Sequence, residues 1–107
     1  MSLRKQQSLF VKKIALLILY AYELGYEVTF GDTYSGKYGH KKNSFHDKGL
    51  AIDLNLFKGG KYLTETEDHE LLGTIWESLG GSWGGNFKDE KGNPKPDGNH
   101  YSFGETS

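Results

Sequence analysis

The stretch from Ser44 to Leu54, SFHDKGLAIDL, places a histidine and an aspartate close together in the chain. Asp53 lies within an alternating aliphatic run that is typical of a strand, where aspartate is disfavoured. His46 precedes that run, and Gly49 between them allows a turn that could bring both side chains to one point. Imidazole nitrogen and carboxylate oxygen are ligands that zinc accepts. The alternative is that both residues are ordinary surface residues, so a metal site requires a third ligand.

Three further histidines are candidates for that ligand: His40, His69 and His100. His69 and the glutamate after it begin like the metalloprotease motif HExxH, but Gly73 stands where the second histidine belongs. His100 opens a predicted strand behind a long polar loop. Asp97, three residues earlier, could act as a general base beside a metal, although Pro-Asp-Gly is also an ordinary turn sequence. Three protein ligands with an open fourth position are typical of catalytic zinc.

The composition excludes several other chemistries. The 107 residues contain no cysteine, so thiolate zinc sites, iron–sulfur clusters and cysteine nucleophiles are absent. The formal net charge of −1 lacks the basic footprint of a nucleic-acid-binding protein. The uncharged run 14–22 is too short for a membrane span, which needs about 20 residues. No small-residue cleavage pattern follows it, so no signal peptide is evident.

The hydrophobic pattern predicts one loop-rich α+β domain over residues 1–107. Helices are expected over 3–24, between Ser2 as cap and Gly25 as stop, and over about 64–79. Strands are expected over 26–30, from Leu50 onward and over 99–103. A hairpin-type turn is expected at 58–61, and loops at 31–43, 83–85 and 88–98. The predicted inward residues of the first helix are Phe10, Ile14, Leu17, Ala21 and Leu24, widened by Leu9, Leu16 and Tyr20. Those of the second are Leu71, Leu72, Ile75, Trp76 and Leu79.

Two short motifs resemble a known enzyme family. The pattern Ser44-x-His46-x-x-Gly49-x-Ala51-x-Asp53-Leu54 resembles a signature of VanY-type zinc D-alanyl-D-alanine carboxypeptidases and L-alanyl-D-glutamate endopeptidases. Asp97-Gly98-Asn99-His100-Tyr101, with Trp83-Gly84-Gly85 upstream, resembles the second signature. These enzymes cleave peptidoglycan and share a fold with the Hedgehog signalling domain. The resemblance therefore implies two helices packed on a small antiparallel sheet.

The resemblance also implies roles for individual residues. A zinc ion would be held by His46, Asp53 and His100, and would activate a water molecule that attacks the peptide carbonyl. Asp97 would serve as the general base and acid. The substrate-binding residues expected from the motifs and the neighbouring loop are Ser44, Lys37, Trp83 and Tyr101. Of these, Trp83 and Tyr101 are expected to form walls of the cleft.

One position departs from the family pattern. Family members usually carry an arginine near residues 33–35 that stabilises the charged intermediate, whereas this chain has Ser35. Lys37, Lys41 or Lys42 could replace it, but lysine lacks the bidentate fork of arginine. Loss of such a donor typically slows turnover by about 10²–10³.

Three functional hypotheses follow. The first is a monomeric zinc metallopeptidase of the phage endolysin type, made in the bacterial or phage-infected cytoplasm and acting on peptidoglycan stem peptides of the cell wall. It would cut either the L-Ala–D-Glu or the D-Ala–D-Ala bond, without an obligate protein partner. The second is a weak or inactive zinc module that binds muropeptides or a protein. The third is a structural domain without metal.

Overall fold

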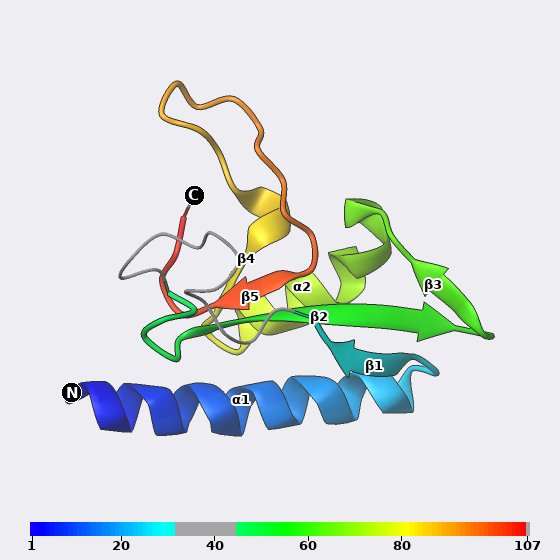
Figure 1. Ribbon diagram of the computed structural model, residues 1–107, viewed down its shortest axis with the longest axis horizontal. Coiled ribbons are helices and arrows are strands. Elements are labelled where there is room, and N and C mark those ends of the chain that lie inside the picture. The colour runs from blue at the N-terminus through cyan, green and yellow to red at the C-terminus, as the bar shows by residue number, and fades with distance from the viewer. Residues whose placement is uncertain (32–44, 107) are drawn as a thin grey trace.

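The computed structural model describes residues 1–31 and 45–106, in which two α-helices pack on a small antiparallel sheet (Figure 1). The helices are α1 (Leu3–Glu23) and α2 (Glu70–Ser78), with short 3-10 helices η1 (Thr66–His69) and η2 (Gly84–Asn86). The strands are β1 (Glu27–Phe30), β2 (Ala51–Lys58), β3 (Lys61–Leu63), β4 (Ser82–Trp83) and β5 (His100–Ser102). This arrangement confirms the predicted α+β class.

Strand β2 organises the sheet, whose order is β1-β2-β5-β4. Its second half pairs with β1 on one edge, while on the other edge β5 pairs with its start and β3 with its end. Gly59 and Gly60 both have positive φ and form the predicted tight turn from β2 into β3. Strand β4, a two-residue strand within a region predicted as loop, was not expected from the sequence.

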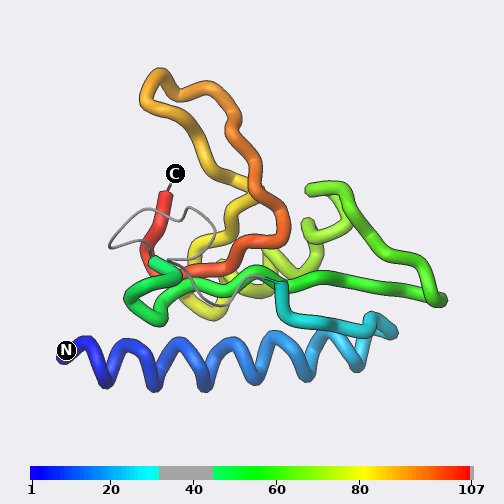
Figure 2. Tube along the Cα trace, in the orientation of Figure 1, coloured from blue at the N-terminus to red at the C-terminus, as the bar shows by residue number. Residues whose placement is uncertain are grey.

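Helix α1 begins and ends as its capping residues predict. The Ser2 hydroxyl accepts the Lys5 amide hydrogen, and Gly25 has a φ of 92° just beyond the last turn. Its buried residues are Phe10, Ile14, Leu17 and Ala21. The expectation of a wider buried surface was wrong: Leu16, Tyr20 and Leu24 are 42%, 49% and 40% exposed. Helix α1 packs through one stripe only, because the sheet lies along one side of it (Figure 2).

Trp76 of α2 lies at the centre of the hydrophobic core. Its ring stacks on Phe103 at 5.7 Å, meets Phe10 of α1 edge-on, and donates from Nε1 to the Ser102 carbonyl. Leu72 is fully buried, as predicted, but Leu71 is 49% exposed because it lies on the outer face of a helix that starts later than expected. One shared core thus joins both helices to β2 and β5.

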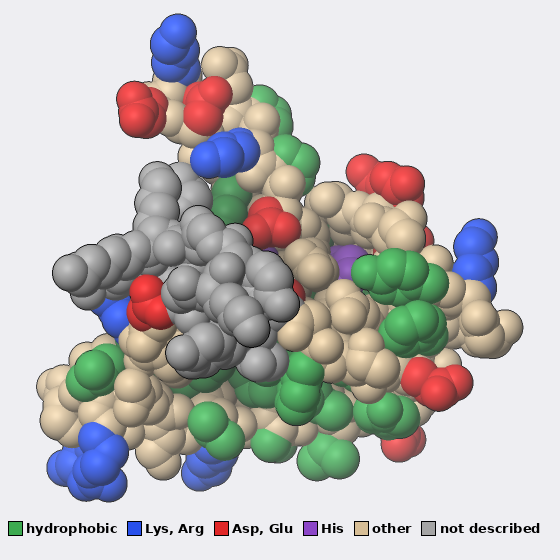
Figure 3. Space-filling view, viewed as in Figure 1, with side chains coloured by type: hydrophobic (Ala, Val, Ile, Leu, Met, Phe, Trp, Pro, Cys, Tyr) green, Lys and Arg blue, Asp and Glu red, His purple; other side chains and the backbone are tan. Residues whose placement is uncertain are grey.

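The surface of this domain retains hydrophobic side chains along α1 and β1, which Figure 3 shows at its lower edge. Within the described residues, no helix combines the length and the hydropathy that a membrane span requires.

Candidate metal centre and cleft

Asp53 and His100 face each other across two neighbouring strands. The register of β2 and β5 pairs their Cα positions directly, and the Leu54 amide donates to the Asn99 carbonyl beside them. Directly opposed residues of an antiparallel pair have neighbouring side chains. The Nδ1 atom of His100 accordingly lies 3.1 Å from Oδ1 of Asp53. The sheet therefore creates this contact between residues that are 47 positions apart in the chain.

His46 reaches the same point from the turn that precedes β2. Gly49 has a φ of 69°, and its amide donates to the His46 carbonyl, so the chain reverses as expected. Helix α1 supports this turn, since the Gln7 side chain donates to the Lys48 carbonyl at 2.6 Å. The Nε2 atom of His46 lies 3.4 Å from Oδ1 of Asp53.

These three side chains form a group that could hold a metal ion. One ligand atom from each lies within 4.8 Å of the other two. His46 and His100 are buried, and the Asp53 side chain is only 18% exposed. Two imidazole nitrogens and one carboxylate oxygen are a donor set suited to zinc and similar transition metals. The residues present therefore fit the metal that the sequence motifs imply.

The ionisation of Asp53 reflects the two histidines beside it. Burial opposes its charge, but hydrogen bonds from His100 and His46, and the charges of these rings, outweigh burial and lower the pKa of Asp53 to about 2. A carboxylate that remains ionised is the form that binds a cation. For His100, burial disfavours the charged ring, but hydrogen bonds to Asp53 and Glu105 outweigh it and raise its pKa.

Asp97 lies beside this group at the end of the long polar loop. Its Oδ2 atom is 3.9 Å from Nδ1 of His100, and its side chain is 55% exposed. Two backbone hydrogen bonds fix the position: the Asp97 amide donates to the Gly84 carbonyl, and the His100 amide donates to the Asp97 carbonyl. Partial burial, assisted by the negative charges of Asp53 and Glu105, outweighs the opposing charge of His100 and raises the pKa of Asp97. A carboxyl group with a raised pKa is better suited to accept and return a proton near neutral pH.

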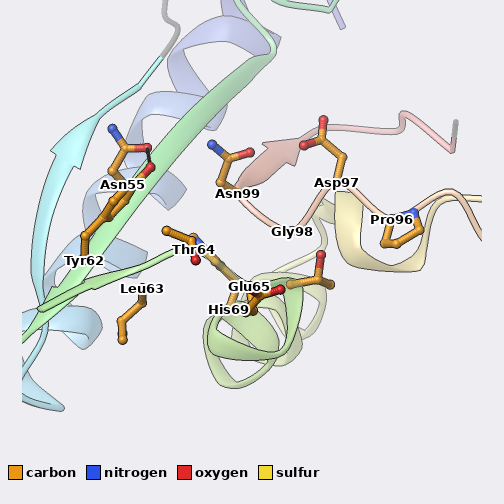
Figure 4. A pocket seen from close by; sticks show the side chains of 11 residues that line it. Asn55, Tyr62, Leu63, Thr64, Glu65, His69, Pro96, Asp97, Gly98 and Asn99 are labelled. Carbon is orange, nitrogen blue, oxygen red and sulfur yellow. Dashed lines mark hydrogen bonds between the residues drawn. The ribbon is translucent and has the colours of Figure 1, made fainter.

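A polar cavity of about 210 Å³ opens from Asp97 (Figure 4). Asp97 and Asn99 lie on one side of it, and Thr64, Glu65 and His69 lie on the other. None of the three candidate metal ligands is among the described residues that line it, so the cavity adjoins the metal group through Asp97. Amides, hydroxyls and carboxylates supply most of the lining, which suits a peptide backbone that offers many hydrogen-bonding groups.

The structure does not support the expectation that Tyr101 and Trp83 form walls of the cleft. Tyr101 is fully buried, its pKa is raised by burial, and its hydroxyl lies 2.8 Å from Nδ1 of His69. Trp83 is 7% exposed and donates from Nε1 to the Gly98 carbonyl. Both lie beneath the cavity and hold residues that line it. Their backbone belongs to strands β4 and β5, whose side chains on this face point into the core.

Several predicted residues lie outside the described part of the chain. The segment 32–44 contains Ser44, Lys37 and His40. It also contains Ser35, near the position where family members usually carry an arginine. Their predicted roles remain sequence-based expectations.

The structure explains why the HExxH motif is broken. A side chain at Gly73 would meet the ring of Trp83 at 2.1 Å, so only glycine fits there. His69 is buried and faces Tyr101, and burial lowers its pKa to about 4. His69 is therefore a neutral residue on the cavity wall, away from the candidate metal ligands.

Sequence reasoning missed one further contact. The Oε1 atom of Glu105 lies 2.6 Å from Nε2 of His100. The sequence offered one signal for this contact: Glu105 is an acidic residue that directly follows Gly104, soon after the candidate ligand His100. That signal does not show a contact, because only the fold brings the two side chains together.

Comparison with known families gives a match over the segment that contains the three candidate metal ligands and Asp97. A family model described as D-alanyl-D-alanine carboxypeptidase matches residues 38–103, which is more than half of the chain. The chain belongs to this peptidase family. Comparison with curated proteins finds no significant match.

Proposed function

We propose that residues 1–107 form one zinc peptidase domain that hydrolyses stem peptides of peptidoglycan. His46, Asp53 and His100 would bind the zinc ion, and Asp97 would act as general base and acid. Zinc bound there would supply a Lewis acid that activates water and polarises the scissile carbonyl. The observation that carries this proposal is the position of Asp97 between the metal group and the polar cavity.

Each residue of the site has a distinct task in this proposal. Asp53 supplies the negative charge of the ligand set and accepts from both histidines before metal binds. Asp97 takes a proton from the attacking water and returns it to the leaving amine, which its raised pKa favours. The cavity beside Asp97 binds and orients the peptide through hydrogen bonds. Orientation of this kind can supply a large share of a rate enhancement.

The family supports this substrate class, and the reaction products identify the scissile bond. Release of free D-alanine from purified peptidoglycan would identify the D-Ala–D-Ala bond, whereas a new D-Glu amino terminus would identify the L-Ala–D-Glu bond. Mass spectrometry of the soluble products separates these outcomes. We further propose that the protein acts on the wall as a phage-type endolysin does, which turbidity clearing of intact cells from outside would test.

The mechanism is tested by Asp97→Asn, with Glu67→Gln as control. Glu67 is an exposed acid on η1 and lies outside the metal group. We expect Asp97→Asn to retain stoichiometric zinc and to lose about 10²–10⁴ in turnover, the usual contribution of a general base. Glu67→Gln should retain both. Turnover by Asp97→Asn at the wild-type rate would refute the role of Asp97.

A zinc module that binds muropeptides without cleaving them is a second candidate. Its support is that no lysine or arginine is among the described residues lining the cavity, so a donor for the developing negative charge is not supplied there. Tight binding of stem peptide by the zinc-loaded protein, with no product after long incubation, would favour this second function.

A further inference from the structure

Glu105 contacts His100 on the side of the ring that faces away from Asp53. Its Oε1 atom lies 2.6 Å from Nε2, while Asp53 lies 3.1 Å from Nδ1. The contact is well shielded from water, since the side chains of His100 and Glu105 are 6% and 21% exposed. The ring of Phe87, 5.4 Å away, packs against the same imidazole. His100 is therefore held between two carboxylates and an aromatic ring.

The chain reaches this contact through a specific turn after β5. Phe103 is anchored in the core against Trp76 and Phe10. Gly104 then adopts a φ of 89°, a conformation that side chains disfavour, and its amide donates to the Ser82 hydroxyl at 3.2 Å. Among the described residues, a Cβ atom at this position would meet only a Phe45 ring carbon at 3.9 Å, and the backbone angle itself favours glycine. The turn directs Glu105 back onto β5.

The contact bears on which nitrogen of His100 binds a metal. A neutral imidazole carries one N–H, and the other nitrogen presents a lone pair. An ionised carboxylate only accepts hydrogen bonds, so Asp53 accepts from Nδ1 while no metal is bound, and Glu105, at the shorter distance of 2.6 Å, favours the tautomer with hydrogen on Nε2 once a metal takes the place of the Nδ1 proton. That tautomer leaves the lone pair on Nδ1, the atom that faces Asp53 and the candidate metal position. A carboxylate behind a ligand histidine also holds the ring orientation.

We propose that Glu105 is a positioning residue for the metal centre, which fixes the tautomer and the ring orientation of His100 through Nε2. The proposal rests on His100 as a metal ligand, which is part of the proposed function. Glu105 lies two residues beyond the segment 38–103 that matches the peptidase family, so that match does not assign it. It does not join the ligand set directly, because the imidazole ring stands between Oε1 and the other two ligands.

The test compares Glu105→Ala, Glu105→Gln and a control, Glu90→Ala. Glu90 is an exposed acid within the long polar loop, and its replacement changes the net charge equally. Zinc affinity is measured by competition with a chromophoric chelator. We expect Glu105→Ala to bind zinc about 10–100-fold more weakly than wild type. Glu105→Gln should recover part of this loss, since its amide oxygen accepts from Nε2, and Glu90→Ala should match wild type.

Two further readouts separate positioning from general structural damage. In the wild-type zinc protein, nitrogen-15 spectra of the histidine rings should show hydrogen on Nε2 of His100, and this signal should weaken or broaden in Glu105→Ala. Cobalt-substituted protein should keep its absorption intensity in Glu105→Gln, because no direct ligand is lost. Circular dichroism of each metal-free variant checks folding before zinc is added.

The proposal fails if Glu105→Ala binds zinc within threefold of wild type, if Glu105→Gln loses as much affinity as Glu105→Ala, or if cobalt spectra show a lost ligand. These three outcomes concern metal binding, so they can be told apart from a failure of the proposed peptidase activity. A wild-type protein that binds zinc but cleaves no stem peptide, with the affinity losses above, would refute the peptidase activity and leave the role of Glu105 supported.

Discussion

Gly84 is the position where one added methyl group should disturb the site most. It starts η2, directly after Trp83, and its carbonyl accepts the Asp97 amide hydrogen at 2.8 Å. A Cβ atom at Gly84 would lie 2.1 Å from the Asp97 carbonyl oxygen and 2.9 Å from Cβ of His100. Gly84→Ala therefore pushes on the proposed base and on a proposed metal ligand together.

The size of the effect follows from these distances. Ordinary contact begins at 3.4 Å, so the two backbones must separate by about 1.3 Å. The colliding atom belongs to the backbone and is held by a hydrogen bond, so a side-chain rotation cannot relieve the overlap. Overpacking of this kind costs about 1–3 kcal/mol. Each kcal/mol corresponds to roughly 4–8 °C in the melting temperature of a domain this small.

The consequence for activity is larger than the consequence for stability. Displacement of Asp97 by about 1 Å from a productive geometry should slow turnover by roughly 10²-fold. Thermal unfolding and product formation are both measured for Gly84→Ala. The control is Asn86→Ala, since Asn86 is exposed and its side chain donates to Glu77 rather than to Asp97 or His100. A Gly84→Ala protein with wild-type melting temperature and turnover would refute the reasoning. A less stable protein with unchanged turnover would refute only its catalytic part.

Three further predictions concern Tyr101 and Trp83 beneath the cavity and His69 in its wall. Tyr101→Phe removes the hydroxyl beside Nδ1 of buried His69, and should lower the free energy of unfolding by about 1–3 kcal/mol in urea titration while zinc affinity stays unchanged. Trp83→Phe leaves the Gly98 carbonyl without the indole donor, and should destabilise the fold by a similar amount, visible as a lower urea midpoint. Burial lowers the pKa of His69 to about 4, against 6.5 in the unfolded chain. Protonation thus favours the unfolded state as the pH falls from about 6.5 to 4. Between pH 7 and pH 4.5, the free energy of unfolding of the metal-free wild type should therefore fall by roughly 2 kcal/mol more than that of His69→Gln. Equal falls in the two proteins would contradict the lowered pKa of His69.

Local sequence patterns were sufficient to predict most elements. The 3- and 4-residue spacing from Phe10 to Ala21 predicted α1, with its cap at Ser2 and its stop at Gly25. Alternation predicted β2, and two glycines predicted the turn after it. These features depend on neighbours in the chain, so local pattern is enough. Burial of Leu24 and Leu71 was predicted wrongly, because exposure depends on which side of each helix the sheet covers.

The sequence by itself determined the chemistry that the site can offer. His46, Asp53, His100 and Asp97 are the residue types that a metal peptidase needs, and their two motifs predicted these roles without a structure. Spacing could not show that they meet, since Asp53 and His100 are neighbours only through the register of β2 and β5.

Only the tertiary structure decided how these side chains are supported. Tyr101 and Trp83 lie under the cavity rather than in its walls, because their strands direct them into the core. Glu105 reaches His100 because Phe103 is anchored against Trp76 and Gly104 then reverses the chain. Contacts of this kind depend on packing between segments far apart in sequence, and such packing leaves no periodic signal in the chain.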